Sequence, residues 1–345
     1  MTIRHEIYEQ PERLEQLLAS SRPQVEQIAR RIRKQGIQLI FLAARGTSDN
    51  AGRYANYLWG AHNGLPLALA APSLFTFYQQ PPRLHNALVV GISQSGQSPD
   101  IVSVLAEGKR QGNLTLALTN DPGSPLAAAA DFVLELKAGP ERAVAATKTY
   151  SAELMVIAML SAALAEDEHA WRELEQVPGW LRTALAQDEW IEHAAARYRY
   201  MQQCVVLGRG YNYATAFEWA LKLKEMTYVA AEPYSSADFQ HGPVAVVSQG
   251  FPVLAVASQG AVLQPMLDLL RHLKVDLQAE LLVISNSPAA LELSQVPIPL
   301  PPQIPEWISP LVNIVPAQLF AYHLTLAKGL DADQPRTIRK VTETT

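Results

Sequence analysis

Three ionisable side chains share one face of a predicted helix in the second half of the chain. In the segment AFEWALKLKE, Glu218, Lys222 and Glu225 stand at positions i, i+4 and i+7, which lie on one side of an α-helix. In a cleft, this acid–base cluster supplies a general base and a cation that stabilises an enolate oxygen, as proton transfer beside a carbonyl requires. On an exposed helix, the same spacing forms an ordinary salt-bridged face. Without further context the second interpretation is favoured.

A hydroxyl-rich turn between a predicted strand and a predicted helix is the second chemical feature. Residues 87–100 read ALVVGISQSGQSPD, an apolar run followed by a polar turn around Gly96 and by Pro99 at a helix start. Backbone N–H groups and the positive end of a helix dipole converge at such a turn, which favours a bound phosphate. The alternative is an ordinary polar connection. We call residues 93–98 the serine turn; its side-chain donors are Ser93, Gln94, Ser95 and Ser98.

Further polar residues could complete such a site. Thr47 and Ser48 directly follow a predicted strand, so their hydroxyls could hold the same anion or could cap the next helix. His241 is a candidate proton donor in a loop, although a lone histidine is more often structural. Lys340 lies in a charged tail, where a solvated lysine is the usual role.

Three strand ends recur in the same order along the chain. The surroundings of Arg45 return near Arg209, those of Ser93 near Ser258, and LALTN at 116–120 returns as LVISN at 282–286. The nearly constant offset predicts two tandem copies of one domain of about 150 residues. The second copy reads SQGAV where the first reads SQSGQ. Because this change removes hydroxyl groups, we expect one phosphate site per chain.

Alternating apolar strands and helices predict an α/β protein with parallel sheets. In the first half, strands are expected near 37–44, 66–70, 87–92, 114–118 and 131–136, and helices near 48–61, 98–111 and 148–165. In the second half, strands are expected near 203–207, 253–257 and 280–284, and a helix near 311–328. The proline-rich residues 297–305 are expected to cross the surface.

The predicted domain order follows from these elements. It comprises an N-terminal helical segment (1–36), a first domain with the serine turn (37–167), a helical connection broken at Pro178-Gly179 (168–200), a second domain with the acid–base cluster (201–328) and a C-terminal tail that closes the active site (329–345).

Composition narrows the class of protein. The 345 residues carry a formal net charge of −5 and are 48% hydrophobic, which favours two cores and gives no basic excess for nucleic acid. Polar residues interrupt the apolar runs, so we expect a cytoplasmic protein with no membrane span or secretion signal. The single cysteine, Cys204, permits no intrachain disulfide and no zinc cluster, and a buried apolar role is expected.

Seven segments in one order resemble the isomerase half of the glutamine:fructose-6-phosphate aminotransferases, over nearly the whole chain. They are RGTS at 45–48, SQSG at 93–96, ERAVAATK at 141–148, LGRG at 207–210, ALKLKE at 220–225, HGP at 241–243, and AYH at 321–323 through DQPR at 333–336. The resemblance implies two tandem sugar-isomerase (SIS) domains, each an αβα sandwich around a flavodoxin-like parallel sheet. It implies no metal or organic cofactor.

The resemblance also implies roles for single residues in a homodimer with a shared active site. The phosphate of a phosphosugar would be bound by Ser48, Ser93, Gln94, Ser95 and Ser98. Glu225 would move a proton between C1 and C2 of an opened hexose 6-phosphate, and His241 of the neighbouring subunit would open the ring. Lys340 would contact the sugar or form a Schiff base with a ketose. Glu218 and Lys222 would support the reacting oxygens, and Val144 and Ala145 would pass close to the sugar.

Departures from the aminotransferase pattern refine this expectation. Thr2 follows the initiator methionine and no glutaminase domain precedes residue 37, so glutamine is not expected to be the direct nitrogen source. The segments ARGTSDNA and SQSGQSPD fit enzymes that convert glucosamine 6-phosphate to fructose 6-phosphate and ammonia. Ala146 and Arg339 differ from the synthase at sugar-contact positions. The alternatives are a fructosamine-6-phosphate deglycase, which releases an amino acid, and a non-catalytic phosphosugar sensor.

Overall fold

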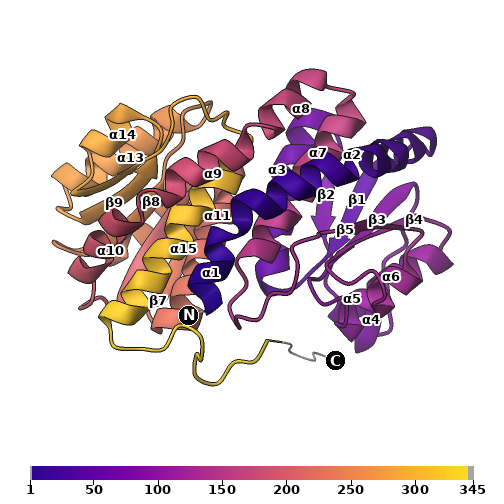
Figure 1. The fold of residues 1–345 in the computed structure, drawn as a ribbon, viewed down its shortest axis with the longest axis horizontal. Helices are drawn as coiled ribbons and strands as arrows, with labels where there is room; N and C mark the ends of the chain where they lie inside the picture. The colour runs from indigo at the N-terminus through magenta and orange to yellow at the C-terminus, as the bar shows by residue number, and fades with distance from the viewer. Residues whose placement is uncertain (1, 341–345) are drawn as a thin grey trace. The chain divides into compact units, whose positions relative to one another are not determined.

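The computed structural model describes residues 2–340, which fold into two compact α/β units (Figure 1). The first unit contains Glu12–Glu141, Lys148–Gln176 and the chain from Arg339. The second unit contains the chain up to Pro11, Arg142–Thr147 and Val177–Ile338. The domain limits predicted from the sequence remain a prediction.

A parallel five-stranded sheet forms the centre of the first unit, in the order β2-β1-β3-β4-β5. The strands are β1 (Leu39–Ala43), β2 (Leu67–Leu69), β3 (Ala87–Ile92), β4 (Leu114–Thr119) and β5 (Phe132–Glu135). All six residues of β3 are buried, because helices cover both faces of the sheet. The order reverses between β1 and β3, as in flavodoxin-like sheets, and this confirms the predicted fold class.

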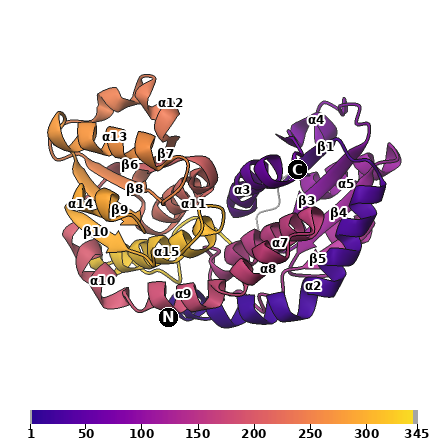
Figure 2. The same ribbon diagram turned by 90° about the horizontal axis from the view of Figure 1, so that it is seen from above.

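The helices of the first unit lie on both faces of its sheet (Figure 2). They are α2 (Gln10–Lys34), whose first residues fall in the second unit, α3 (Gly46–Asn63), α4 (Ser73–Thr76), α5 (Pro99–Arg110), α6 (Pro125–Ala129), α7 (Lys148–Ala165) and α8 (Glu168–Leu174). Helices α3 and α7 pack together. Val104 and Leu105 of α5 join Val89 and Leu126 in a buried core. All strands and helices predicted for the first half agree with the structure within two residues at each end.

The second unit repeats this topology with the strand order β10-β9-β8-β6-β7, again parallel throughout. The strands are β6 (Gln203–Gly208), β7 (Ala230–Ser235), β8 (Pro252–Val256), β9 (Glu280–Ser285) and β10 (Val296–Pro299). The order reverses between β6 and β8, as it does between β1 and β3. The two predicted copies therefore share one fold.

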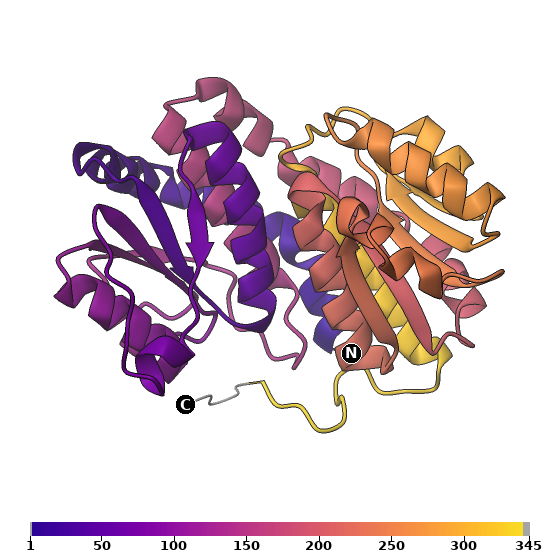
Figure 3. The same ribbon diagram turned by 180° about the vertical axis from the view of Figure 1, so that it is seen from behind.

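Helices also cover both faces of the second sheet, with α13 and α14 over one face (Figure 3). The helices are α1 (Thr2–Tyr8), α9 (Val177–Leu185), α10 (Asp188–Arg197), η1 (Gly210–Asn212), α11 (Tyr213–Lys222), η2 (Leu223–Thr227), α12 (Ser236–Gln240), η3 (Pro243–Val246), α13 (Leu263–Val275), α14 (Pro288–Glu292) and α15 (Ser309–Ala327). The helical connection predicted to break at Pro178-Gly179 is interrupted at residues 175–176, between α8 and α9. Pro178 itself lies in the first turn of α9, where a missing N–H costs no hydrogen bond.

The two edge strands of the second sheet differ from the sequence-based expectation. The strand β7 was not predicted, and β10 occupies part of the proline-rich stretch that was expected to cross the surface and for which no strand was predicted. Pro233, Pro297 and Pro299 lie on these edge strands, where a residue without an N–H is tolerated because one side of the strand has no partner. In the second sheet, the prediction therefore failed at the two edge strands and held for the inner strands.

One helix, α7, is long and apolar enough to cross a membrane by length and composition, with a mean hydropathy of 1.2. Its 18 residues are 89% buried inside the protein. Burial on nearly all sides is typical of the central helix of a large core, which is hydrophobic all round. We therefore describe α7 as a core helix.

Candidate functional site

The serine turn has a backbone shape that requires glycine at its centre. It connects the end of β3 at Ile92 to the start of α5 at Pro99. Gly96 has φ +63°, and a β-carbon there would lie 2.1 Å from the Ser124 Oγ atom. The Gly96 N–H donates to both the carbonyl oxygen and the Oγ of Ser93, each at 3.1 Å. The sequence-predicted turn is thus a fixed and tightly packed loop.

Carbonyl groups of the serine turn are bonded to the neighbouring strand and loop. The Gln94 carbonyl accepts from the Asn120 N–H at 3.1 Å and from the Thr119 hydroxyl at 3.3 Å. The Gly96 carbonyl accepts from the Leu126 N–H at 3.1 Å. Ser98 is the N-cap residue of α5 and makes no side-chain capping bond, so its hydroxyl is not used to cap the helix. Together these bonds fix the turn at the start of the α5 dipole.

A residue of the loop after β1 contacts α5, the helix that follows the serine turn. This contact lies at the switch point between β1 and β3, where the strand order reverses. The Arg45 guanidinium lies 2.8 Å from a carboxylate oxygen of Asp100, in the first turn of α5. In open α/β sheets, ligands bind in the crevice at such a switch point, beside the carboxyl ends of the strands. Arg45 was not among the predicted site residues, although its position after β1 was a usable signal.

Thr47 and Ser48 lie in the first turn of α3 and do not cap it. The N-cap residue is Arg45, which makes no side-chain capping bond, so the capping alternative is wrong. The buried Ser48 hydroxyl donates to Glu153 Oε1 on α7 at 2.7 Å. In this structure the Ser48 proton is therefore directed at a carboxylate, and Ser48 would have to turn to donate to an anion.

The acid–base cluster is buried inside the second unit. The Lys222 ammonium lies 3.3 Å from Glu218 Oε1 and 2.6 Å from Glu225 Oε2. The side chains of Glu218 and Lys222 are 0% and 1% exposed, whereas that of Glu225 is 24% exposed. The interpretation as an exposed salt-bridged face is therefore wrong. Because burying three charged groups is costly, this arrangement points to chemistry at Glu225, the member that solvent can reach.

Electrostatics keep Lys222 in its charged form. Burial alone lowers the pKa of a lysine, but attraction by Glu218 and Glu225 and their hydrogen bonds outweigh burial, so the pKa of Lys222 is raised. A permanently protonated amine cannot act as a base or a nucleophile near neutral pH. It can stabilise a negative oxygen and orient the Glu225 carboxylate.

The helix that carries the cluster changes its winding between Lys222 and Glu225. The α-helix α11 ends at Lys222, and η2 continues from Leu223 to Thr227 as a π-helix. Tyr228 follows with φ +59°, an uncommon conformation for a residue with a side chain. Wide turns of this kind are frequent at functional sites. The expected continuous α-helical face is thus only partly correct, although the three side chains do meet.

A cavity of about 360 Å³ in the second unit is lined by Glu225. Its other walls are Lys224 and Tyr228–Ala230 together with residues 336–338 of the C-terminal segment. The Arg336 guanidinium lies 3.9 Å from the centre of the Tyr228 ring, and the Arg336 N–H donates to the Tyr228 hydroxyl at 2.8 Å. The candidate base therefore faces a cavity, and Tyr228 holds the C-terminal segment at its edge. No sequence signal pointed to Tyr228.

The remaining predicted residues stand outside the helix that carries the acid–base cluster. His241 follows α12 and is exposed. The Lys340 ammonium contacts the buried Glu141 carboxylate at 2.5 Å in the first unit, and Glu141 also accepts from the N–H and hydroxyl of Thr149. Val144 is partly exposed and Ala145 is buried. Glu141 stands in the segment ERAVAATK, but its contact with Lys340 was not predicted.

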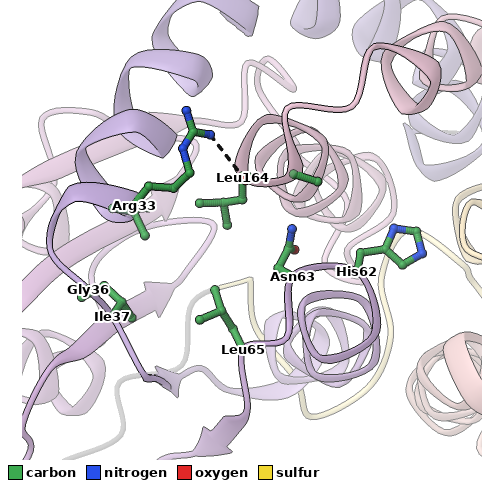
Figure 4. Close-up of a pocket in the computed structure, with 9 residues that line it drawn as sticks. Arg33, Gly36, Ile37, His62, Asn63, Leu65 and Leu164 are labelled. Atoms are coloured by element: carbon green, nitrogen blue, oxygen red, sulfur yellow. Dashed lines mark hydrogen bonds between the residues drawn. The ribbon is translucent and has the colours of Figure 1, made fainter.

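A second cavity of about 360 Å³, in the first unit, contains none of the predicted residues. It is lined by Arg33, Ile37, His62, Leu65 and neighbouring residues (Figure 4). Ile37 and Leu65 precede β1 and β2, so this cavity lies at the amino ends of the strands. Arg33 donates to the Ala163 carbonyl and to Glu166. Because ligands of such sheets bind at the carboxyl ends, we assign this cavity no function.

Fold and site together define a class of protein. The chain is a duplicated flavodoxin-like α/β protein with the glycine-centred serine turn at one switch point and the acid–base cluster in the other unit. Among residues 2–340, no group of three or more His, Cys, Asp or Glu side chains is arranged to hold a metal ion.

Within this class, the chain belongs to the SIS-domain family, whose model matches residues 33–163 and 200–328. The chain is 33% identical to the isomerizing glutamine–fructose-6-phosphate aminotransferase of Aquifex aeolicus over 97% of its own length and 56% of that protein. It therefore spans about half the length of this relative. Among solved structures, the C-terminal domain of glucosamine-fructose-6-phosphate aminotransferase from Francisella tularensis matches with a TM-score of 0.89 and 29% identity, over 97% of this chain and 98% of that one.

A glucosamine-6-phosphate deaminase from Thermotoga maritima shares the fold, with a TM-score of 0.79 and 21% identity over the full length of both chains. The family and the aminotransferase relatives support a phosphosugar isomerase. They also confirm the family resemblance seen in the sequence.

Proposed function

We propose that this protein is an amino-sugar phosphate deaminase and aldose–ketose isomerase, which converts glucosamine 6-phosphate and water to fructose 6-phosphate and ammonia. The observation that carries the proposal is the buried acid–base cluster, in which Glu225 alone reaches a cavity. A binding protein needs the serine turn but has no use for a buried ammonium held between a buried carboxylate and a partly exposed one. This argues against the sensor.

The proposed reaction assigns a separate task to each charged group. The serine turn binds the phosphate, with backbone N–H groups and the α5 dipole as donors. Glu225 removes the proton at C2 of the open-chain sugar and returns it at C1, while the Lys222 ammonium stabilises the oxygen at C1. The resulting imine at C2 takes up water and releases ammonia. His241 is proposed to open the ring and Lys340 to contact the sugar, as do Val144 and Ala145.

The one cysteine of these 345 residues is not placed to act as a nucleophile. Glutamine hydrolysis by a thiol needs an accessible thiolate. Cys204 is the one cysteine in the sequence, and it is buried in β6. Burial raises the pKa of its thiol to about 12. The buried Cys204 thiol is therefore no candidate for that role.

The test is incubation of the purified chain with glucosamine 6-phosphate, with ammonia and fructose 6-phosphate measured separately. Both products are expected in equal amounts, and neither is expected from fructose 6-phosphate with glutamine. Release of an amino acid from a fructosamine 6-phosphate, without ammonia from glucosamine 6-phosphate, would instead identify a deglycase. Ligand binding without turnover of either substrate would identify a sensor. A cytoplasmic homodimer with a shared site is part of the proposal, and size-exclusion chromatography with light scattering tests the dimer.

A further inference from the structure

The second unit has its own switch point, and it corresponds to the serine turn of the first unit. Residues 258–262 follow β8 and lead into α13, a helix of 13 residues. By the sequence repeat, Ser258 corresponds to Ser93 and Gly260 to Ser95. A loop of this kind at a helix start attracts anions.

A carboxylate of the chain itself occupies this position. The Ala261 N–H donates to Glu306 Oε2 at 2.8 Å, and the Val262 N–H points to Glu306 Oε1 at 3.4 Å. Gly260 has φ +149°, and a β-carbon there would lie 2.2 Å from Glu306 Cδ. Glycine thus allows the carboxylate to lie directly against the backbone, as a bound anion would.

The space behind the loop is closed by a buried polar network. The Ser258 hydroxyl accepts from Asn212 Nδ2 at 3.1 Å and from Asn313 Nδ2 at 2.9 Å. Asn313 Nδ2 also donates to Asn212 Oδ1 at 2.8 Å, and all three side chains are buried. In the first unit, the corresponding Ser93 hydroxyl accepts only from the Gly96 backbone among the bonds found in residues 2–340. The second loop is therefore built around internal partners.

Glu306 is itself held in place by the start of α15. Its carbonyl oxygen accepts from the Ser309 N–H at 3.2 Å and from the Ser309 hydroxyl at 2.7 Å. The carboxylate is therefore tethered at a high effective concentration beside the loop, with which a free anion would have to compete.

We propose that Glu306 is a specificity-determining residue that fills the anion site of the second unit and so restricts the chain to one phosphosugar site. The inference rests on the proposed function where it takes the serine turn as the phosphate site. Its core, that Glu306 stands in for a bound anion, concerns the second unit alone. Removing the carboxylate leaves two N–H groups and a helix dipole that an oxyanion can satisfy.

The experiment counts inorganic phosphate bound per chain by equilibrium dialysis at constant ionic strength, for the wild type and for Glu306→Ala. We expect the count to rise by about one per chain in the variant, from about one to about two. Asp268→Ala is the matched control, because it removes an exposed carboxylate from α13 itself and is expected to leave the count unchanged. An unchanged count in Glu306→Ala, or an equal rise in the control, overturns the proposal.

Two further measurements keep the test decisive. Glu306→Ser, which also removes the carboxylate, replaces the alanine variant if that protein does not fold. Phosphate is also expected to raise the melting temperature of either variant by about 3 °C more than that of the wild type, and an equal rise counts against the proposal. If the wild type binds no phosphate and releases no ammonia, the proposed function fails, while a rise from zero to one in Glu306→Ala still supports the role of Glu306.

Discussion

The two units share a strand order, but the loops at their corresponding switch points differ in their hydrogen-bond partners. In the first unit, a serine-rich loop enters α5, and the Ser98 hydroxyl makes no capping bond. In the second unit, the corresponding loop is satisfied by Glu306 and backed by buried asparagines. A repeated fold can thus keep the same loop position in both copies while the polar groups around that loop find different partners.

The helices that follow β1 and β6 also carry different polar side chains. In the first unit, the residue after β1 that turns inward is Ser48, which donates to Glu153. In the second unit, α11 continues into the buried acid–base cluster. Under the proposed function, the binding groups belong to the first unit and the proton-transfer groups to the second.

The largest effect is expected from Lys222→Met, which leaves the buried Glu218 and the partly exposed Glu225 without their cation. We expect a loss of unfolding free energy of about 3–5 kcal/mol, measured by urea denaturation, together with loss of activity. The folded-state pKa of Lys222 is raised. The contribution of the charged lysine to the free energy of unfolding is therefore fully present below the unfolded pKa of about 10.4, and it is lost as the pH rises through the folded-state pKa. The stability difference should therefore not shrink as pH rises from about 7 to about 9. A difference that shrinks with rising pH in this range contradicts the assignment.

Glu225→Gln tests whether the second unit carries the chemistry. We expect kcat for ammonia release to fall by about 10²-fold or more, with the affinity for inorganic phosphate unchanged because the serine turn is intact. Glu232→Gln is the control, since Glu232 is an exposed carboxylate on β7 of the same unit. Comparable rates for wild type and Glu225→Gln would remove Glu225 from the mechanism.

A pair of glycine substitutions compares the two loops directly. Gly96→Ala and Gly260→Ala each place a methyl group in close contact at positive φ, so both should cost about 1–3 kcal/mol of stability. Only Gly96→Ala is expected to weaken phosphosugar binding, by about tenfold, which is about 1.4 kcal/mol. Isothermal titration calorimetry measures the affinities. Equal losses of affinity in both variants would mean that the second loop also binds ligand.

The smallest effects concern the arginines that follow β1 and β6. Arg45→Ala breaks a half-exposed contact with the buried Asp100, and we expect a loss of about 1 kcal/mol or less with a modest rise in KM at unchanged kcat. Arg209 makes only a long contact of 3.5 Å with the Ser236 hydroxyl, so Arg209→Ala should change stability by less than about 0.5 kcal/mol. Thermal unfolding measures the stability of both variants, and steady-state kinetics measures their KM. A larger rise in KM for Arg209→Ala than for Arg45→Ala would indicate that the substrate phosphate binds in the second unit.

Local patterns predicted the inner strands and the serine turn because these depend on nearby residues. Continuous apolar runs define β1, β3 and β4, and Gly96 and Pro99 mark the turn that follows β3. The edge strands β7 and β10 were missed because they contain prolines and have a partner on one side only. The face shared by Glu218, Lys222 and Glu225 was predicted by spacing, but its burial was not.

Contacts between distant segments could not be read from spacing. Glu306 and Ala261 are 45 residues apart, and Lys340 and Glu141 are 199 apart. Such pairs depend on how the sheet brings loops together, and a single sequence carries no signal for them. The change from α to π winding at Leu223 has the same origin, because packing rather than propensity selects it.

That change of winding constrains how this part of the gene can vary. A π-helical turn holds one residue more than an α-helical turn, so η2 is equivalent to a one-residue insertion just before Tyr228. Deleting any single residue from Leu223–Thr227 would restore regular winding and swing the carboxylate of position 225, or the ring of position 228, away from the cavity they share. Lineages that keep this chemistry should therefore exchange side chains here while preserving the length of the segment.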